Sequence, residues 1–249
     1  MRFAGKTALI TGASRGIGLA VASRLVSEGA RVVITGRSQE RLDEAVRGLG
    51  GSAVALGVAG KADDAHHQEN TVDLTIRTFG TIDLLVNNTG INPFYGPLVD
   101  LDPDIARKTV DVNCLAALAW SKRAHQCWMA EHGGAIVNVS SVAGLRPAPG
   151  IGFYGASKAM LTYITRELAI ELAPRVRVNA VAPAVVKTNF AAALYEGKEA
   201  EVAANYPLKR LGEPADVAGA VAFLLSADAA WVTGHCIVID GGLTLAGGV

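Results

Sequence analysis

The sequence predicts an α/β protein with a doubly wound (Rossmann) fold, in which a seven-stranded parallel sheet carries helices on both faces. Seven short, nearly continuous apolar runs suit strands that are buried on both sides. Segments with helical spacing of apolar residues lie between them, so strand and helix alternate along the chain. Such alternation implies βαβ units with right-handed crossovers. No linker or internal repeat divides the 249 residues, and residues 1–249 are expected to form a single domain.

The elements follow in order from the apolar runs. Strands are expected at 7–10, 31–35, 53–56, 83–86, 135–140, 177–181 and 236–240. Helices are expected at 18–28, 41–49, 64–79, 105–129, 155–172 and 214–225. One long connection, which contains Phe190, Leu194, Tyr195 and Tyr206, interrupts this rhythm after the sixth strand. Because long loops at the carboxyl end of a strand often cover active sites, residues 184–210 are predicted to form a substrate lid.

Composition and charge exclude several classes of protein. With 50% hydrophobic residues the chain can bury a large core, and 23 basic against 23 acidic residues leave no net charge for nucleic acid or an anionic membrane. No signal-peptide core and no long apolar span are present, so a soluble, cytoplasmic protein is expected. The three cysteines and five histidines lack metal-ligand spacing, and the cysteines are expected to be buried apolar residues. No metal site is predicted.

A glycine-rich loop joins the first strand to the first helix. Its sequence runs Thr-Gly-Ala-Ser-Arg-Gly-Ile-Gly over residues 11–18, with glycines spaced GxxxGxG. Glycines allow backbone N–H groups to approach a pyrophosphate, which the positive end of the helix also attracts. The candidate cofactor residues here are Gly12, Ser14, Arg15, Gly16, Ile17 and Gly18. The alternative is a glycine-rich turn that binds nothing.

A second polar segment ends the fourth strand. Asn88, Thr89 and Gly90 lie there, beside the first strand if the sheet reverses its direction at that point, which is where a dinucleotide would bind. An Asn pair can also serve only to form a turn.

Three further residues point to acid–base chemistry. Ser141 ends the fifth strand, Tyr154 follows thirteen residues later, and Lys158 lies one helical turn beyond it. This combination is rare by chance in a chain with 5 Tyr. Lys158 lies about 5 to 6 Å from Tyr154 on the same helix face, and its ammonium is expected to lower the tyrosine pKa. Tyr154 would then exchange a proton with a carbonyl or alcohol oxygen, while Ser141 donates a hydrogen bond to that oxygen. The alternative is a surface Tyr/Lys pair.

Together these motifs resemble the short-chain dehydrogenase/reductase family over essentially the whole chain, and within it the 3-oxoacyl-carrier-protein reductase branch. The resemblance implies that Asn113, Ser141, Tyr154 and Lys158 are catalytic. It also implies that Lys158 binds the nicotinamide ribose and that Asn113 holds a water linking Lys158 to solvent. Pro183, Val186 and Thr188 match the segment that holds the nicotinamide carboxamide, and Val58 matches the adenine pocket.

Three positions depart from the pattern of the family. Thr89 replaces an Ala close to the cofactor, Ala184 replaces a Gly before the lid, and Gly57 precedes Val58 where many relatives have Asp. The Ala is expected to stiffen the hinge of the lid, because it restricts φ.

The end of the second strand predicts the choice of cofactor. NAD-dependent enzymes usually place Asp or Glu there to bind the ribose 2′-hydroxyl. Here Gly36 and Arg37 occupy this position, and Arg15 approaches from the glycine-rich loop. NADP(H) is therefore the expected cofactor, with NAD(H) as the other candidate.

The predicted activity is interconversion of a small-molecule carbonyl and a secondary alcohol, and 3-oxoacyl reduction is one candidate. A dinucleotide-binding sensor or scaffold without turnover is the alternative, although it would have no need of Tyr154. Apolar faces on the segments 105–129 and 155–172, with Trp120 and Trp128 on the former, predict a homotetramer. The C-terminal stretch 243–249 is expected to join that assembly.

Overall fold

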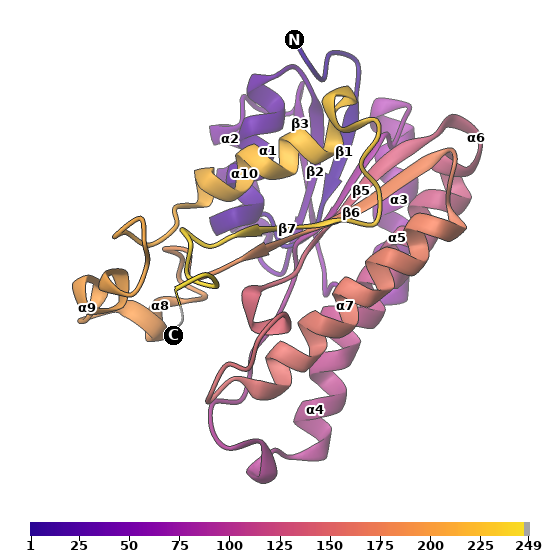
Figure 1. Cartoon of the computed structure of the whole chain (residues 1–249). Coiled ribbons are helices and arrows are strands. Elements are labelled where there is room, and N and C mark those ends of the chain that lie inside the picture. The colour runs from indigo at the N-terminus through magenta and orange to yellow at the C-terminus, as the bar shows by residue number, and fades with distance from the viewer. Residues whose placement is uncertain (247–249) are drawn as a thin grey trace.

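The computed structural model, which describes residues 1–246, confirms the predicted fold class (Figure 1). Seven parallel strands form one sheet in the order β3-β2-β1-β4-β5-β6-β7. The strands are β1 (Thr7–Ile10), β2 (Arg31–Gly36), β3 (Ala55–Ala59), β4 (Leu84–Asn87), β5 (Gly134–Val139), β6 (Val176–Pro183) and β7 (Cys236–Ile239). The chain crosses from β3 at one edge back to β4, where Ile10 pairs with Val86. A crevice is therefore expected at the carboxyl ends of β1 and β4.

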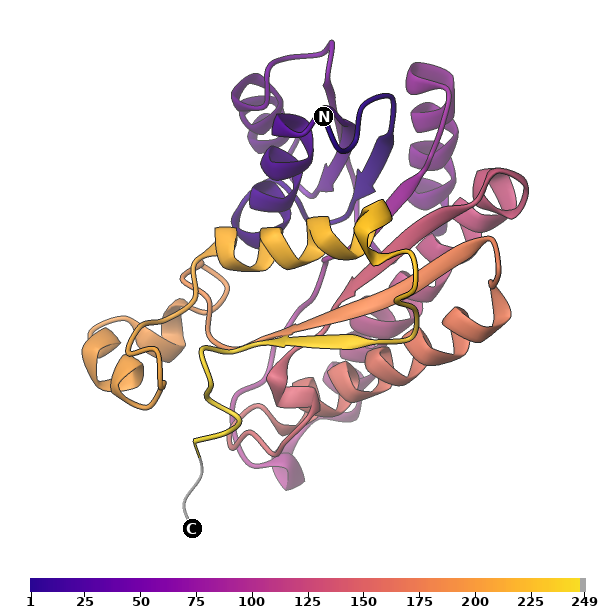
Figure 2. The same ribbon diagram turned by 45° about the horizontal axis from the view of Figure 1, so that its top comes forward.

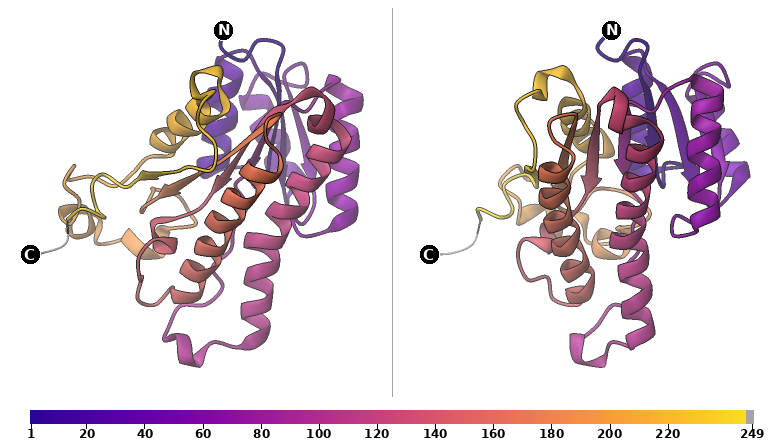
Figure 3. Two further views of the ribbon diagram at one scale, coloured as in Figure 1. Left: turned by 45° about the vertical axis from the view of Figure 1, so that its right-hand side comes forward. Right: turned by 90° about the vertical axis from the view of Figure 1, so that its right-hand side faces the viewer.

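Helices cover the sheet in two layers, as the two views of Figure 3 show. The principal helices are α1 (Gly16–Ser27), α2 (Gln39–Gly48), α3 (Ala65–Phe79), α5 (Ala116–Ala124), α7 (Gly152–Glu171) and α10 (Pro214–Leu225). Two cores result: one joins the sheet to α1, α2 and α10, and the other joins it to α3, α5 and α7. Successive strand residues alternate between them, so Ile10 lies in the first core and Leu9 in the second.

The third strand begins two residues later and ends three residues later than the sequence predicts. β3 pairs with β2 from the pair of Val32 and Ala55 to the pair of Gly36 and Ala59. This pairing with β2 extends the strand beyond the apolar run at 53–56. Gly57 is required inside this strand, because a Cβ there would lie 2.8 Å from the Cβ of Leu42 in α2. The carboxyl end of β3, and with it the wall of the crevice, therefore begins after Ala59.

The predicted helix 105–129 is divided into several segments. Residues 103–132 form α4 (Pro103–Val110), a π-helical turn (Asp111–Leu115), α5, a second π-helical turn (His125–Met129) and α6 (Ala130–His132), so the helical region extends beyond the predicted range at both ends. π-turns inside α-helices often occur at functional sites. The first of them contains Asn113.

Two expectations about single residues are wrong. Trp120 is 1% exposed and donates a hydrogen bond from Nε1 to the Ala62 carbonyl at 3.0 Å, so it belongs to the core and not to an exposed face. Cys127 is exposed, whereas Cys114 is buried as predicted. Apolar periodicity identifies a helix, but it cannot separate a face that packs on a sheet from one left open to solvent.

The segment expected to be the lid carries two short helices, α8 (Ala192–Tyr195) and α9 (Glu199–Ala204). They project beyond the carboxyl end of β6, on the side of the sheet where the chain ends (Figures 1 and 2). The segment is tied down at its base. Val186 bridges to Gly212, and the Tyr206 hydroxyl, in a side chain 3% exposed, accepts a hydrogen bond from the Val185 N–H.

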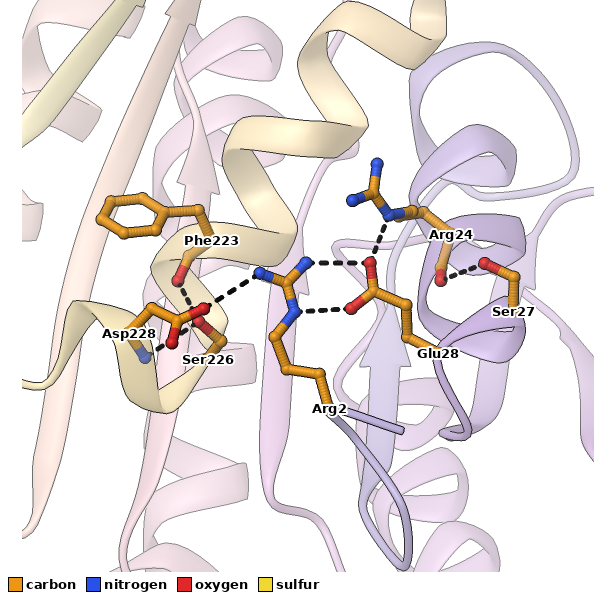
Figure 4. Close-up of polar contacts among 7 residues, drawn as sticks. All are labelled: Arg2, Arg24, Ser27, Glu28, Phe223, Ser226 and Asp228. Carbon is orange, nitrogen blue, oxygen red and sulfur yellow. Dashed lines mark hydrogen bonds and ion pairs between the residues drawn. The ribbon is translucent and has the colours of Figure 1, made fainter.

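At the opposite end of the molecule, an ion-pair cluster ties the N-terminal segment to α1 and to the turn after α10 (Figure 4). Arg2 donates two hydrogen bonds to the Glu28 carboxylate, at 2.5 and 2.8 Å, and one to Asp228 at 3.2 Å. Arg24 also pairs with Glu28. The hydrogen bonds from Arg2 lower the pKa of Glu28 from 4.5 to about 2.

We expect this cluster to stabilise the protein only above acidic pH. Because the pKa of Glu28 is lower in the folded state, its contribution is complete above pH 4.5 and is lost as the pH falls toward 2. Arg2→Gln should therefore cost about 1 kcal/mol at pH 7, the upper end for such partly exposed pairs. Urea unfolding of the wild type, Arg2→Gln, Glu28→Gln and the double variant, at pH 7 and pH 3, tests this. A coupling energy that is equal at both pH values would contradict it.

Among residues 1–246, no helix is both long and apolar enough to cross a membrane. In the same residues, no group of three or more His, Cys, Asp or Glu side chains is arranged to hold a metal ion.

Candidate active site

A cavity of about 1400 Å³ opens at the carboxyl ends of the central strands. It brings together most residues that the sequence singled out. Those lining it are Gly12, Ser14, Arg15, Gly16, Ile17, Arg37, Asn88, Thr89, Gly90, Ser141, Tyr154, Lys158, Pro183, Val186 and Thr188. Gly18, Val58 and Asn113 do not line it; all three are buried behind its walls.

The glycine-rich loop forms one wall and leaves no room for side chains. Gly12 and Gly16 have φ of +63° and +60°, in the left-handed region that glycine tolerates. A Cβ on Gly12 would lie 2.8 Å from Thr89 Oγ1, and one on Gly18 would lie 2.6 Å from Asn88 Nδ2. Helix α1 begins at Gly16 without a side-chain cap, so its first N–H groups stay available for an anion.

Asn88 locks this loop to the end of β4. Its Nδ2 donates to the carbonyls of Thr11 and Gly12, both at 2.9 Å. Thr11 Oγ1 in turn accepts from the N–H groups of Asn88 and Thr89, at 3.0 and 3.1 Å. The hydroxyl of Thr89, where the family pattern has Ala, faces Gly12 and adds bulk to the cavity wall beside the loop.

One end of the cavity is positively charged. Arg15 and Arg37 both line it and are exposed, and they come from the glycine-rich loop and the end of β2. Gly60 donates its N–H to the Gly36 carbonyl at 2.8 Å, which brings the turn after β3 beside them. Lys61, on that turn, also lines the cavity. Lys61 is not among the residues predicted from the sequence, because the expected strand 53–56 ends too early to place it at the cavity.

Val58 has a different place from the one expected. It is 8% exposed and packs in the core with Val33 and Val72, while residues 60–63 form the cavity wall instead. The later end of β3 explains the difference, since the strand runs to Ala59 and Val58 still lies within it.

The polar groups on the opposite wall come from β5 and α7. Ser141 directly follows β5, and its Oγ accepts from the Ala143 N–H at 3.2 Å. Tyr154 and Lys158 lie one turn apart on α7, with Lys158 Nζ 5.6 Å from the centre of the tyrosine ring. Lys158 is 2% exposed and donates to the Val139 carbonyl at 2.8 Å.

The protein alone does not lower the tyrosine pKa as the sequence predicts. Burial raises the pKa of Tyr154 to about 12, and the Ser141 hydroxyl offsets only part of this. Burial also lowers the pKa of Lys158 to about 8. Desolvation penalises the charged form of both groups, and it is the largest cause of both shifts. At pH 7 Lys158 is still mostly protonated and Tyr154 holds its proton.

Gly90 keeps the space beside Lys158 open. A Cβ there would lie 3.2 Å from Lys158 Nζ and 3.6 Å from Asn113 Oδ1. Asn113 is fully buried, exchanges hydrogen bonds of 2.8 and 3.0 Å with the backbone of Ile91, and donates to Ser157 Oγ at 2.9 Å. Its side chain therefore holds the loop after β4 against α7.

The lid segment closes the remaining side. Thr188 lies over the glycine-rich loop, where a Cβ on Gly16 would come within 3.3 Å of its Cγ2. The Phe190 ring lies 6.1 Å from that of Tyr154 and is 56% exposed. Ala184 donates its N–H to the Ile239 carbonyl at 3.0 Å, so a hydrogen bond joins the hinge of the lid to β7. The Ala side chain also restricts the φ angle at this hinge.

The fold and this cavity define the chain as a doubly wound α/β protein with a large cavity at the switch point of its sheet. A family model described as enoyl-(acyl carrier protein) reductase matches residues 12–244. The human and Caenorhabditis elegans proteins called dehydrogenase/reductase SDR family member 4 are each 41% identical to the chain, over 243 and 250 residues. These matches cover 96% and 97% of this chain, and 87% and 96% of the two relatives.

Solved structures agree with the sequence matches. The crystal structure described as short-chain dehydrogenase/reductase SDR:glucose/ribitol dehydrogenase from Brucella melitensis superposes with a TM-score of 0.92 at 34% identity, covering 97% of this chain and 98% of that one. A short-chain type dehydrogenase/reductase from Mycobacterium ulcerans gives a TM-score of 0.93 at 33% identity, covering 100% and 93%. The chain belongs to the short-chain dehydrogenase/reductase family, whose members are oxidoreductases that bind NAD(P)(H).

Proposed function

We propose that this protein is an NADP(H)-dependent oxidoreductase that interconverts a small-molecule carbonyl and a secondary alcohol, with Tyr154 as general acid and base. One observation carries the proposal: Ser141, Tyr154 and Lys158 face the same cavity as the glycine-rich loop. A reacting oxygen at Tyr154 would thus lie beside a bound nicotinamide. A sensor without turnover would not need this arrangement.

The residues present fit a dinucleotide. Gly12 and Gly16 leave the backbone of the loop open to a pyrophosphate, Gly90 leaves space next to Lys158, and Thr188 faces the loop from the lid. When bound, the nicotinamide supplies or accepts the hydride and, in its oxidised form, carries a positive charge.

The chain itself manages the proton. In reduction, Tyr154 transfers its proton to the carbonyl oxygen as charge develops there, and the Ser141 hydroxyl donates a hydrogen bond to the same oxygen. In oxidation, the phenolate removes the proton from the alcohol. Because burial holds the pKa of Tyr154 at about 12 in the protein alone, the phenolate needs further positive charge in the complex. Asn113 acts as a positioning residue through Ile91 and Ser157.

A screen of ketones and secondary alcohols, followed at the nicotinamide absorbance with NADPH, NADH and their oxidised forms, tests the proposal. The panel includes a 3-oxoacyl thioester, since 3-oxoacyl reduction is one candidate within it. Turnover that requires Tyr154 supports an enzyme. Tight binding of the dinucleotide with no turnover across the panel would favour the sensor or scaffold.

We further propose that the protein assembles as a homotetramer. Leu115 and Leu118 near the start of α5 and Met160, Tyr163 and Ile170 on α7 are 38% to 75% exposed. An exposed patch formed by several large apolar side chains usually packs against another protein surface. The C-terminal stretch 243–249 is also expected to join the tetramer interface. Of this stretch the structure describes residues 243–246, and residues 247–249 lie outside the described part of the chain.

Sedimentation velocity at micromolar concentration should give a single species near four times 25.8 kDa. Tyr163→Lys, which places a charge on the exposed face of α7, should dissociate it, whereas Arg41→Ala on the exposed side of α2 should not. A monomeric wild type would contradict the proposal.

A further inference from the structure

The wall of the cavity carries many more cations than anions. Seven basic side chains line it: Arg15, Arg37, Lys61, Lys108, Arg146, Lys158 and Lys187. Within residues 1–246, Asp63 is the single carboxylate that does so.

Two of the seven cations have a carboxylate partner within the described part of the chain. Lys108 pairs with Asp63, and Lys187 Nζ lies 3.3 Å from Glu199 and 2.5 Å from Glu213. Lys158 belongs to the catalytic group. Arg15, Arg37 and Lys61 gather at the nucleotide end, where phosphate charge is expected. Arg146 remains.

Arg146 lies at the other end of the cavity, in the loop between Ser141 and Tyr154. Its backbone N–H donates to the Val142 carbonyl at 3.2 Å, which fixes the start of the loop. The guanidinium is exposed and reaches the Leu243 carbonyl only at 3.5 Å, the limit of a hydrogen bond. It forms no ion pair within 4.0 Å in the described part of the chain. Asp240, on the C-terminal segment, instead accepts the N–H groups of Gly242 and Thr244.

The surroundings of Arg146 are largely apolar. Leu243 contacts Arg146, Tyr95 packs against Gly150 in the same loop, and Phe190 lies beside Tyr154, and all three line the cavity. Arg146 and the three residues after it line a second groove as well as the cavity, and Arg146 is exposed, so it lies where the cavity opens to solvent. A ligand that fills this end would contact apolar walls along its length and a single positive charge at the mouth.

We propose that Arg146 binds the carboxylate of an oxo-acid substrate whose carbonyl is held at Tyr154 and whose apolar segment occupies this end of the cavity. The inference rests on the proposed oxidoreductase function and names its substrate class. One guanidinium matches one carboxylate in charge and can bind both oxygens through two parallel N–H groups. A phosphate dianion would call for more donors than this end of the cavity offers.

Matched pairs of an oxo acid and its methyl ester test the proposal, beginning with 4-oxopentanoate and then acids with longer chains. The wild type is expected to have a lower KM for the acid at the best chain length. In Arg146→Gln the ratio of the acid KM to the ester KM should rise about 10-fold or more, the size expected for losing one charge-assisted contact. Arg166→Gln, a cation on α7 that does not line the cavity, is the control. Salt should raise the acid KM in the wild type but not in Arg146→Gln.

Calorimetric binding of the same acids, with NADP⁺ present, gives a readout that needs no turnover. Arg146-dependent binding of the acid supports the proposal even if the panel of carbonyls and alcohols fails. It is overturned if acid and ester behave alike, if Arg146→Gln changes both equally, or if that variant alters sedimentation and leaves the KM ratio unchanged. Any of these outcomes leaves the proposed oxidoreductase function standing, provided that a neutral ketone is reduced.

Discussion

Replacing Tyr154 with Phe should lower kcat at least 100-fold, the low end for loss of a general acid or base. The substitution removes the hydroxyl and keeps the ring that packs 6.1 Å from Phe190. No other phenol is placed one turn from Lys158 on α7. With the pKa of Tyr154 at about 12 in the protein alone, the hydroxyl is a proton donor at neutral pH. Steady-state reduction of the best ketone, with equilibrium binding of NADPH, measures the effect.

Cofactor binding and the unfolding transition should be unchanged in this variant, because the hydroxyl is not part of the core. Tyr163→Phe is the matched control: it removes a phenolic hydroxyl from the same helix, at a side chain 61% exposed, and should leave kcat at the wild-type value. If Tyr154→Phe turned over at a near-normal rate, Tyr154 would have no part in the mechanism.

Arg37→Ala should remove most of a 10- to 1000-fold preference for NADPH over NADH in kcat/KM. Arg37 and Arg15 approach one end of the cavity from two elements, and Gly36 stands where an NAD-dependent enzyme presents a carboxylate. A charge-assisted hydrogen bond contributes about 1.5 to 3 kcal/mol, and each 1.4 kcal/mol corresponds to about tenfold. Both side chains are exposed, so solvent screening reduces these values.

The loss should come from weaker binding of NADPH, with kcat/KM for NADH nearly unchanged, since NADH lacks the 2′-phosphate. Arg41→Ala, four residues further along the chain and away from the cavity, is the control and should keep the preference. Lys61→Ala shows whether the turn after β3 contributes as well. Equal or better use of NADH by the wild type would refute the assignment.

The local pattern of apolar residues was sufficient to predict the order of the strands and helices along the chain. Buried parallel strands must be apolar along their length, and helices that cover a sheet must be amphipathic, so the alternation could be found without tertiary information. The glycine-rich loop and the Tyr154–Lys158 pair are also local, because a turn or a single helical repeat determines their geometry. Their meeting at one cavity follows from the topology of the sheet, which places the carboxyl ends of all parallel strands at one edge.

Four features could be found only in the tertiary structure, because each depends on contacts between distant segments. The end of β3 is decided by its register with β2 and by the packing of Leu42 on Gly57, and for this reason Val58 lies in the core while Lys61 reaches the cavity. Trp120 is buried in the core, where the Ala62 carbonyl, from the distant turn after β3, accepts its N–H. The direction of the Tyr154 pKa shift is set by desolvation, which is the sum of all atoms around the hydroxyl and has no local signature. That Arg146 lacks a carboxylate partner among residues 1–246 is likewise visible only in the structure, where Glu199 and Glu213 pair with Lys187 and Asp240 accepts backbone N–H groups.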